Sequence, residues 1–162
     1  MATLMIPSII SILVACLSFF LNALYTNRKY RKKKDEYLLN NFYNPICSLL
    51  TENSRLYSCF GPKTFSEYNM DRRMESGELW ESIKTKALIP NLSFIRKILI
   101  QHQYFYLNTS AKSAYSDLHL HCLAFALYND KPNAIYHKFK FNPEWVDIIE
   151  QDRKMYIERI SK

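Results

Sequence analysis

The sequence predicts a mostly α protein with a single N-terminal transmembrane helix followed by a small helical cytosolic domain. Residues 4–25 carry no charged side chain, and six of the seven residues at 28–34 are Lys or Arg. The 162-residue chain contains only two glycines, which disfavours hairpin-rich sheets and glycine-rich phosphate loops. We therefore divide the chain into a span at residues 1–27, a basic juxtamembrane linker at 28–34 and one helical ligand-binding domain at 35–162.

The uncharged run is long enough to cross a lipid bilayer. It has 22 residues, and a hydrocarbon core of about 30 Å takes roughly 20 helical residues. A cleavable signal peptide is disfavoured, because Met1, Ala2 and Thr3 carry no side-chain charge and no clean cleavage site follows the run. The alternative interpretation is an unusually hydrophobic helix that is buried inside a protein core.

The basic linker predicts the orientation. Flanks rich in Lys and Arg stay cytoplasmic, so we expect a single-pass protein of the inner (cytoplasmic) membrane with its N-terminus outside and residues 35–162 inside the cell. All fifteen acidic residues follow position 34 and nearly balance the basic residues there, so the net charge of +7 belongs to the linker. The charge thus indicates a lipid bilayer as partner, or the topology signal alone, and not duplex nucleic acid.

The first helix of the domain is predicted over residues 35–59. Mostly apolar side chains recur there at alternating spacings of three and four, which places them on one stripe of a helix. Gly61 and Pro62 end this helix. Pro45 lies inside the pattern, so we expect the helix to be kinked there or to begin afresh just before it. The stripe consists of Leu39, Phe42, Ile46, Leu49, Asn53, Leu56 and Phe60.

Three further helices are predicted in the middle of the chain. Ser76 caps a helix that ends at Pro90, and residues 92–107 form its antiparallel neighbour. Residues 112–128 form an amphipathic helix, while residues 64–73 are compatible with a short helix or a loop. The inward side of the 112–128 helix carries Leu118, Cys122 and Phe125.

The C-terminal part contains one ambiguous segment and one clear helix. Residues 134–141 alternate between apolar and polar side chains as a strand would. Asn142, Pro143 and Glu144 then supply an N-cap, a first-position proline and a first-turn acid for a helix that reaches about residue 160.

Small and polar residues follow one face of the span, at spacings of three and four. Such a face lets membrane helices approach closely and form hydrogen bonds, so we expect a homo-oligomer; the alternative is a monomeric anchor. Steps of seven residues continue this line from Ser11 through Leu39 and Ile46 to Asn53, which suggests one axis through span and domain. The predicted oligomer face consists of Ser8, Ser11, Ala15, Ser18 and Asn22.

The sequence offers no catalytic or metal-binding motif. His119 and His121 are two residues apart, so on a helix they face different ways and cannot hold one metal ion, although on a strand they could. Asp117 and His121 are spaced to pair on a helix surface. No serine elbow, activated cysteine or paired-carboxylate motif is present, and the four cysteines are expected to be free thiols. We therefore expect no enzyme activity, no metal and no cofactor.

Tyrosines interleaved with basic residues predict a ligand-binding surface. Aromatic faces stack on nucleobases while Lys and Arg contact phosphates, so such clusters suit a nucleotide or a short single strand. The alternative is that the tyrosines cover edges of the core and the lysines solvate the helices. The candidate ligand-binding residues are Arg96, Lys97, Tyr104, Lys112, Tyr136, His137, Lys138 and Lys140.

Three segments after the span and linker carry a resemblance to known proteins. They are Phe-Tyr-Asn-Pro-Ile at 42–46, Leu-Leu-Thr-Glu-Asn at 49–53 and Phe-Gly-Pro-Lys-Thr-Phe at 60–65. With this layout the chain resembles small bacterial membrane-anchored proteins and is similar to the membrane effectors of type III CRISPR antiviral defence. The resemblance implies an oligomer whose cytosolic domain binds cyclic oligoadenylate and whose membrane helices then damage the bilayer, for example as a pore. The alternative function is a passive anchor or scaffold that recruits a protein partner to the inner membrane.

Overall fold

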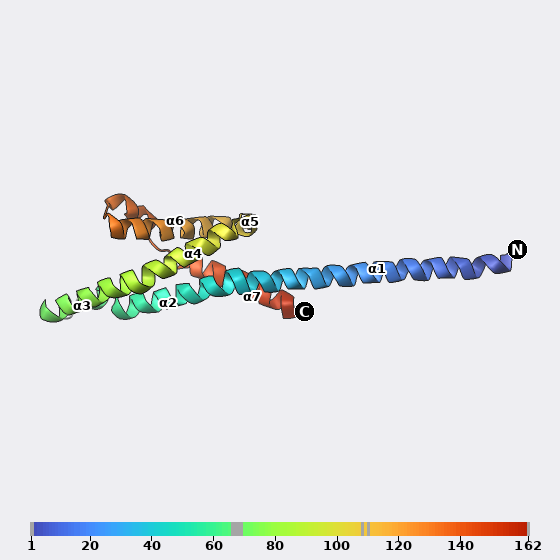
Figure 1. The fold of residues 1–162 in the computed structure, drawn as a ribbon, viewed down its shortest axis with the longest axis horizontal. Helices are drawn as coiled ribbons and strands as arrows, with labels where there is room; N and C mark the ends of the chain where they lie inside the picture. The colour runs from blue at the N-terminus through green and yellow to red at the C-terminus, as the bar shows by residue number, and fades with distance from the viewer. Residues whose placement is uncertain (1, 66–69, 108, 110, 162) are drawn as a thin grey trace.

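The chain is mostly α in the computed structural model. Its regular elements are all helical in the described part, where there is no strand, which confirms the predicted fold class at this level. Figure 1 shows one long helix that projects from a bundle of helices, with the N-terminus at its far end. The backbone is described for residues 2–65, 70–107, 109 and 111–161. Side chains are described for the same residues except 2–10, 64, 65, 70–74 and 137.

The N-terminal helix and the first helix of the domain form one unbroken rod. α1 (Ala2–Leu38) passes through a π-helical turn, η1 (Leu39–Tyr43), into α2 (Asn44–Phe60). The Asn44 N–H bonds to the carbonyl of Leu39, five residues back, so the turn is widened just before Pro45, which has no N–H to donate. The helix therefore neither stops nor begins afresh at Pro45.

Gly61 ends the rod, as the sequence predicts. Its backbone is extended, with φ −72° and ψ 165°, and its N–H donates to the Tyr57 carbonyl at 2.9 Å. A Cβ on Gly61 would lie 2.3 Å from that same oxygen, so any other residue would force the chain to shift. Pro62 then begins a short 3₁₀ helix, η2 (Pro62–Phe65).

A second rod returns beside the first. α3 (Met70–Ile83), the π-helical turn η3 (Lys84–Leu88) and α4 (Ile89–Gln101) follow one another without a break. The Ile89 N–H bonds to the carbonyl of Lys84, which again widens the helix just before a proline, Pro90. The prediction that Pro90 separates two antiparallel helices is therefore wrong, because the π turn lets one helix continue through it.

The remaining elements close the bundle. α5 (Gln103–Tyr106) and α6 (Lys112–Asp130) follow α4, and α6 packs along it. η4 (Ala134–Phe139) is a 3₁₀ helix whose first turn is capped by the side chain of Asn133, so the strand interpretation of 134–141 is wrong. α7 (Glu144–Ser161) ends the chain and lies against α1 and η1. The predicted N-cap of α7 is confirmed, because Asn142 Oδ1 accepts the Glu144 N–H at 3.0 Å.

The core is centred on η1. Phe42 lies 5.5 Å from the ring of Tyr115 on α6, and Tyr43 lies 4.8 Å from the ring of Tyr156 on α7. The Tyr115 hydroxyl donates to Asp152 Oδ2 at 2.8 Å, and burial raises the pKa of Tyr115 so that it keeps this proton. The other large, fully buried side chains are Leu38, Ile46, Ile95, Leu99, Leu118 and Ile149.

The same core contradicts the prediction of one oligomer axis through span and domain. Ile46 is 0% exposed inside the chain's own core. Asn53 Oδ1 accepts a hydrogen bond from Asn91 Nδ2 of α4 at 2.9 Å. Both side chains thus make their contacts inside one chain. The heptad line that starts at Ser11 therefore does not continue through Ile46 and Asn53 as an interface with a second copy.

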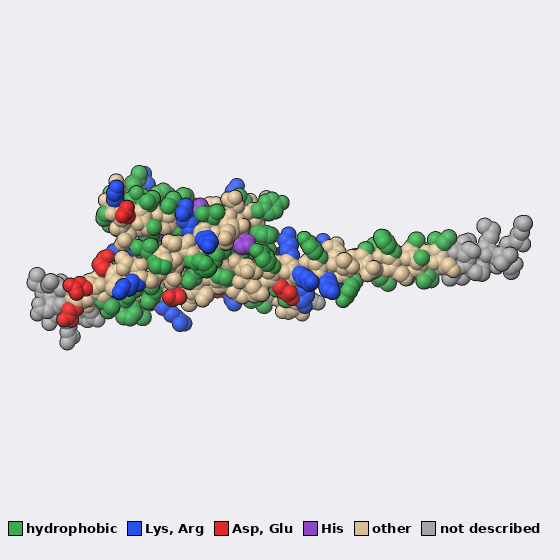
Figure 2. All heavy atoms as spheres, in the orientation of Figure 1, with side chains coloured by type: hydrophobic (Ala, Val, Ile, Leu, Met, Phe, Trp, Pro, Cys, Tyr) green, Lys and Arg blue, Asp and Glu red, His purple; other side chains and the backbone are tan. Residues whose placement is uncertain are grey.

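The N-terminal part of α1 lies outside the bundle. Every residue from 11 to 34 is exposed, including Leu17 at 59% and Phe19 at 77%. Figure 2 shows Lys and Arg gathered where α1 reaches the bundle, and hydrophobic side chains further out. Among the side chains that the structure describes, which begin at Ser11, no helix is long and apolar enough to cross a membrane.

Replacing Phe42 by Ala should destabilise the domain strongly. Phe42 is 1% exposed at the centre of the core, and such a truncation typically costs about 3–5 kcal/mol. The matched control is Phe94→Ala on α4, because Phe94 is 50% exposed and its loss should cost under about 1 kcal/mol. Urea denaturation of both full-length variants measures the difference, and equal losses would contradict a core centred on η1.

Candidate functional site

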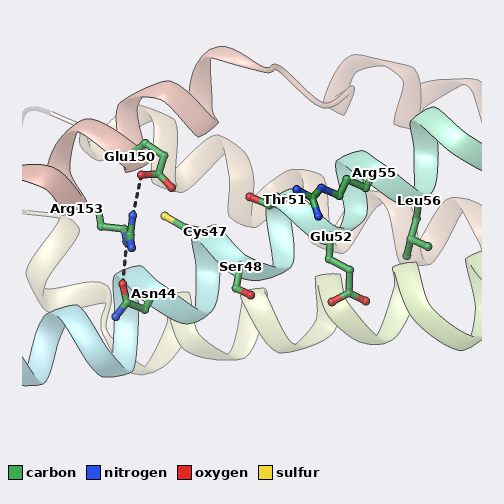
Figure 3. A pocket seen from close by; sticks show the side chains of 9 residues that line it. All are labelled: Asn44, Cys47, Ser48, Thr51, Glu52, Arg55, Leu56, Glu150 and Arg153. Atoms are coloured by element: carbon green, nitrogen blue, oxygen red, sulfur yellow. Dashed lines mark hydrogen bonds and ion pairs between the residues drawn. The ribbon is translucent and has the colours of Figure 1, made fainter.

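An open groove of about 580 Å³ lies between α2 and α7 (Figure 3). Both walls contribute charged side chains, and α2 also contributes hydroxyls. The lining residues are Asn44, Cys47, Ser48, Thr51, Glu52, Arg55, Leu56, Glu150 and Arg153.

Arg153 ties the two walls of the groove together. Its Nε donates to Asn44 Oδ1 at 2.8 Å, and its Nη1 lies 3.2 Å from Glu150 Oε2. The Arg153 and Glu150 side chains are 33% and 31% exposed, so the ion pair adds little stability and mainly fixes the guanidinium. Asn44, which accepts this hydrogen bond, is the residue that closes η1.

The cysteine in this groove is not an activated nucleophile. Cys47 is 6% exposed, and burial together with the nearby Glu150 carboxylate raises the pKa of its thiol to about 12. Burial likewise raises the pKa of Cys122 on α6 to about 12. The four cysteines are free in the structure, and only Cys16 and Cys59 are exposed.

The first group of predicted ligand-binding residues lies on α4, α5 and the start of α6. Arg96 is partly buried, and its Nε donates to His119 Nε2 on α6 at 3.2 Å. Lys97 and Lys112 are exposed, and Tyr104 on α5 is 77% exposed. None of these four side chains lines the α2–α7 groove.

The second group lies around η4. Tyr136 is partly buried against the ring of Tyr128, while Lys138 and Lys140 are exposed. The side chain of His137 lies outside the described residues. η4 is held to α6 because His121 Nδ1 lies 2.8 Å from the carbonyl oxygen of Phe139.

The two groups flank opposite sides of α6. Arg96 contacts His119, whereas η4 contacts His121, and residues two apart on a helix are turned by roughly 200°. Within one chain the predicted residues are therefore not brought together into a single pocket. The α2–α7 groove was missed from the sequence, because Arg55 and Arg153 come from distant segments that share no motif.

The predicted oligomer face lies on the projecting part of α1. Ala15, Ser18 and Asn22 are exposed, as is Ser11, and the side chain of Ser8 lies outside the described residues. A shallow surface patch on the same helix extends this face towards the bundle. It consists of Phe19, Asn22, Ala23, Thr26, Asn27 and Tyr30, of which only Asn22 was singled out from the sequence.

The histidines do not form a metal centre in the described part of the chain, where no group of three or more His, Cys, Asp or Glu side chains is placed to hold an ion. His121 is 7% exposed, and burial lowers its pKa. A carbonyl oxygen can only accept a hydrogen bond, so Nδ1 of the neutral His121 ring carries the proton and donates to the carbonyl of Phe139. Asp117 instead accepts from Ser113 at 3.3 Å, so the predicted pairing of Asp117 with His121 is not formed.

Comparison with known proteins gives no relative. No family model matches the chain, and no curated protein and no solved structure is significantly similar to it. The function is therefore argued from the residues and their geometry.

Acid should destabilise the domain through His121. Burial lowers the pKa of His121 in the folded chain. Below the ordinary value of about 6.5, the unfolded chain therefore binds a proton that the folded chain does not, and the free energy of unfolding decreases as the pH is lowered. Urea denaturation across this range measures the slope. His121→Gln should flatten it more than His119→Gln, because His119 is less buried. Equal slopes in wild type and His121→Gln would contradict the assignment.

Proposed function

We propose that this chain is an inner-membrane effector that self-assembles through α1 and binds an anionic nucleotide messenger, such as cyclic oligoadenylate, in antiviral defence. The observation that supports it most is the unbroken helical path from Ala2 to Phe60. Along this path the uncharged run, the basic linker and the centre of the core belong to one rod. A ligand that moves the bundle against η1 therefore acts on the N-terminal segment directly.

A bilayer suits the projecting part of α1. Burying apolar surface is worth about 25 cal/mol per Å², and here large side chains such as Leu17, Phe19 and Phe20 are more than half exposed in the single chain. The uncharged run begins at residue 4, so seven of its residues precede the first described side chain. The proposed membrane span therefore rests on the uncharged sequence of residues 4–25 as a whole.

The linker at residues 28–34 supports an orientation with the bundle in the cytoplasm. Its six basic side chains are exposed where α1 reaches the bundle, and each favours anionic headgroups by about 1 kcal/mol near the surface. Lys34 also lies over the ring of Phe105, with Nζ 5.4 Å from its centroid. This contact joins the linker to α5 of the bundle.

Self-assembly is supported by the polar side of α1. Asn22, Thr26 and Asn27 lie with Ala23 along one side of the exposed helix, where a second helix can approach and pair with the amides. An amide that faces lipid without a partner is costly, so a neighbouring copy is the natural occupant of this side.

The nucleotide is proposed to bind between subunits. The two groups of basic and aromatic residues flank α6, so one ligand reaches both groups only where two chains meet. A cyclic oligonucleotide carries several equivalent phosphates and matches such a symmetric site. The same dispersion of Lys97, Lys112 and Lys138 over exposed surface favours the second candidate, a passive scaffold that recruits a protein partner.

Two arginines in the run should release the protein from the membrane. Each Arg near the centre of a span costs about 2.5–3.5 kcal/mol, so Leu17→Arg with Phe20→Arg should shift most of the full-length chain out of the carbonate-washed membrane pellet. The matched control is Leu17→Val with Phe20→Leu, which should stay in the pellet. Recovery of the wild type in the supernatant would refute the anchor.

Charge reversal at both groups should weaken nucleotide binding. We expect Lys97→Glu and Lys138→Glu each to weaken cyclic oligoadenylate by about tenfold, because each removes a phosphate contact worth about 1.4 kcal/mol. Lys86→Glu on the exposed side of η3 is the control and should change little. Calorimetry on the full-length protein in detergent measures this, and no heat with wild type at tens of micromolar would leave the scaffold as the better candidate.

A further inference from the structure

We propose that the α2–α7 groove is a binding site for an extended, phosphate-bearing ligand that contacts Arg55 at one end and Arg153 at the other. The proposal rests on the groove itself and does not require the subunit interface proposed above. Its two guanidinium groups and the position of Asn44 point to it.

Arg55 is a cation ready to bind an anion. It is exposed, and no hydrogen bond or ion pair joins its guanidinium to another residue in the described part of the chain. Glu52, three residues earlier, is not paired with it, and Figure 3 shows Glu52 turned away while Arg55 extends towards Thr51. A phosphate here gains a charge-assisted, bidentate contact without displacing a protein partner.

Arg153 has donors left over at the other end. A guanidinium has five N–H donors, and the contacts with Asn44 and Glu150 use two of them. The side chain is about one third exposed, so the remaining donors are accessible to a ligand. Its orientation is already fixed by these contacts, which lowers the entropy that binding must cost.

The spacing selects an extended ligand. The Arg153 side chain lies at Asn44 and that of Arg55 extends towards Thr51, and these two positions are seven residues apart on α2, which corresponds to about 10 Å of helix. A single phosphate ion cannot contact both ends. The lining between them is mixed, with the hydroxyl of Thr51 and the neutral thiol of Cys47. It also includes two carboxylates, of which Glu150 is paired with Arg153 and Glu52 is turned away, so a linear oligonucleotide or a polyphosphate chain binds through the two arginines.

A ligand in this groove acts on the π turn. Asn44 closes η1 through its N–H bond to Leu39 and accepts the hydrogen bond from Arg153 through its side chain. A phosphate on the remaining donors of Arg153 leaves this second contact in place and so links the ligand to Asn44. The groove therefore couples ligand binding to the segment through which α1 joins the bundle.

The test titrates full-length protein in detergent with linear tetra-adenylate and, separately, with inorganic tripolyphosphate. Arg55→Gln and Arg153→Gln should each weaken both probes by about tenfold, while the control Lys154→Gln, on exposed α7 surface outside the groove, should change either by less than about twofold. Arg55 makes no contact that the fold needs, so Arg55→Gln decides the matter even if Arg153→Gln fails to fold.

The outcomes separate this site from the proposed function. Tripolyphosphate binding that depends on Arg55 supports the groove, even if no adenylate binds and the nucleotide function fails. Binding of both probes that is kept in Arg55→Gln overturns the groove, and loss of adenylate binding in Lys97→Glu and Lys138→Glu then supports the subunit interface. Absence of binding by both probes to wild type overturns the groove.

Discussion

The fold depends on how two helices accommodate a proline in their interior. A proline has no amide hydrogen, and its ring collides with the carbonyl four residues earlier in an α-helix. Here the turn before Pro45 and the turn before Pro90 are both widened, so that Asn44 and Ile89 bond five residues back. The widened turn at η1 also brings the consecutive residues Phe42 and Tyr43 into the core. One local adjustment thus keeps the rod continuous and supplies the centre around which α4, α6 and α7 pack.

The sequence predicted the elements whose signals are local. The stop at Gly61 and the N-cap at Asn142 depend on neighbouring residues, and both are present. The predicted apolar stripe is confirmed where Phe42 and Ile46 are buried, but its last member, Phe60, is 39% exposed. The helix through Pro90 was not predicted, because nothing within α3 or α4 distinguishes a proline that ends a helix from one that follows a π turn. Packing of α4 against α2 and α6 holds that helix together, and this packing is nonlocal.

The candidate sites likewise include features that the sequence predicted and features that only the fold creates. The exposure of Lys97, Lys112 and Lys138 agrees with an accessible basic surface, but the sequence could not show that α6 separates the two groups. The α2–α7 groove has no sequence signal, since its walls come from the first and last helices of the bundle. Arg153 and Asn44 meet only in the folded chain. Their contact places one end of the groove at the end of the π turn.

The two proposed sites differ in how directly they contact η1, the turn that joins α1 to the bundle. Removing the extra residue of the π turn would rotate α1 against the bundle by about 100° and shift it by about 1.5 Å, since that is the step of one α-helical residue. Such a change disturbs the packing of Phe42 and Tyr43 on α6 and α7, so a ligand must bind the altered state more tightly than the resting one. Arg153 contacts the residue that closes this turn. Lys97 and Lys138 lie on α4 and η4 without such a contact in the described part, so a ligand there acts on α1 only by moving whole helices against one another.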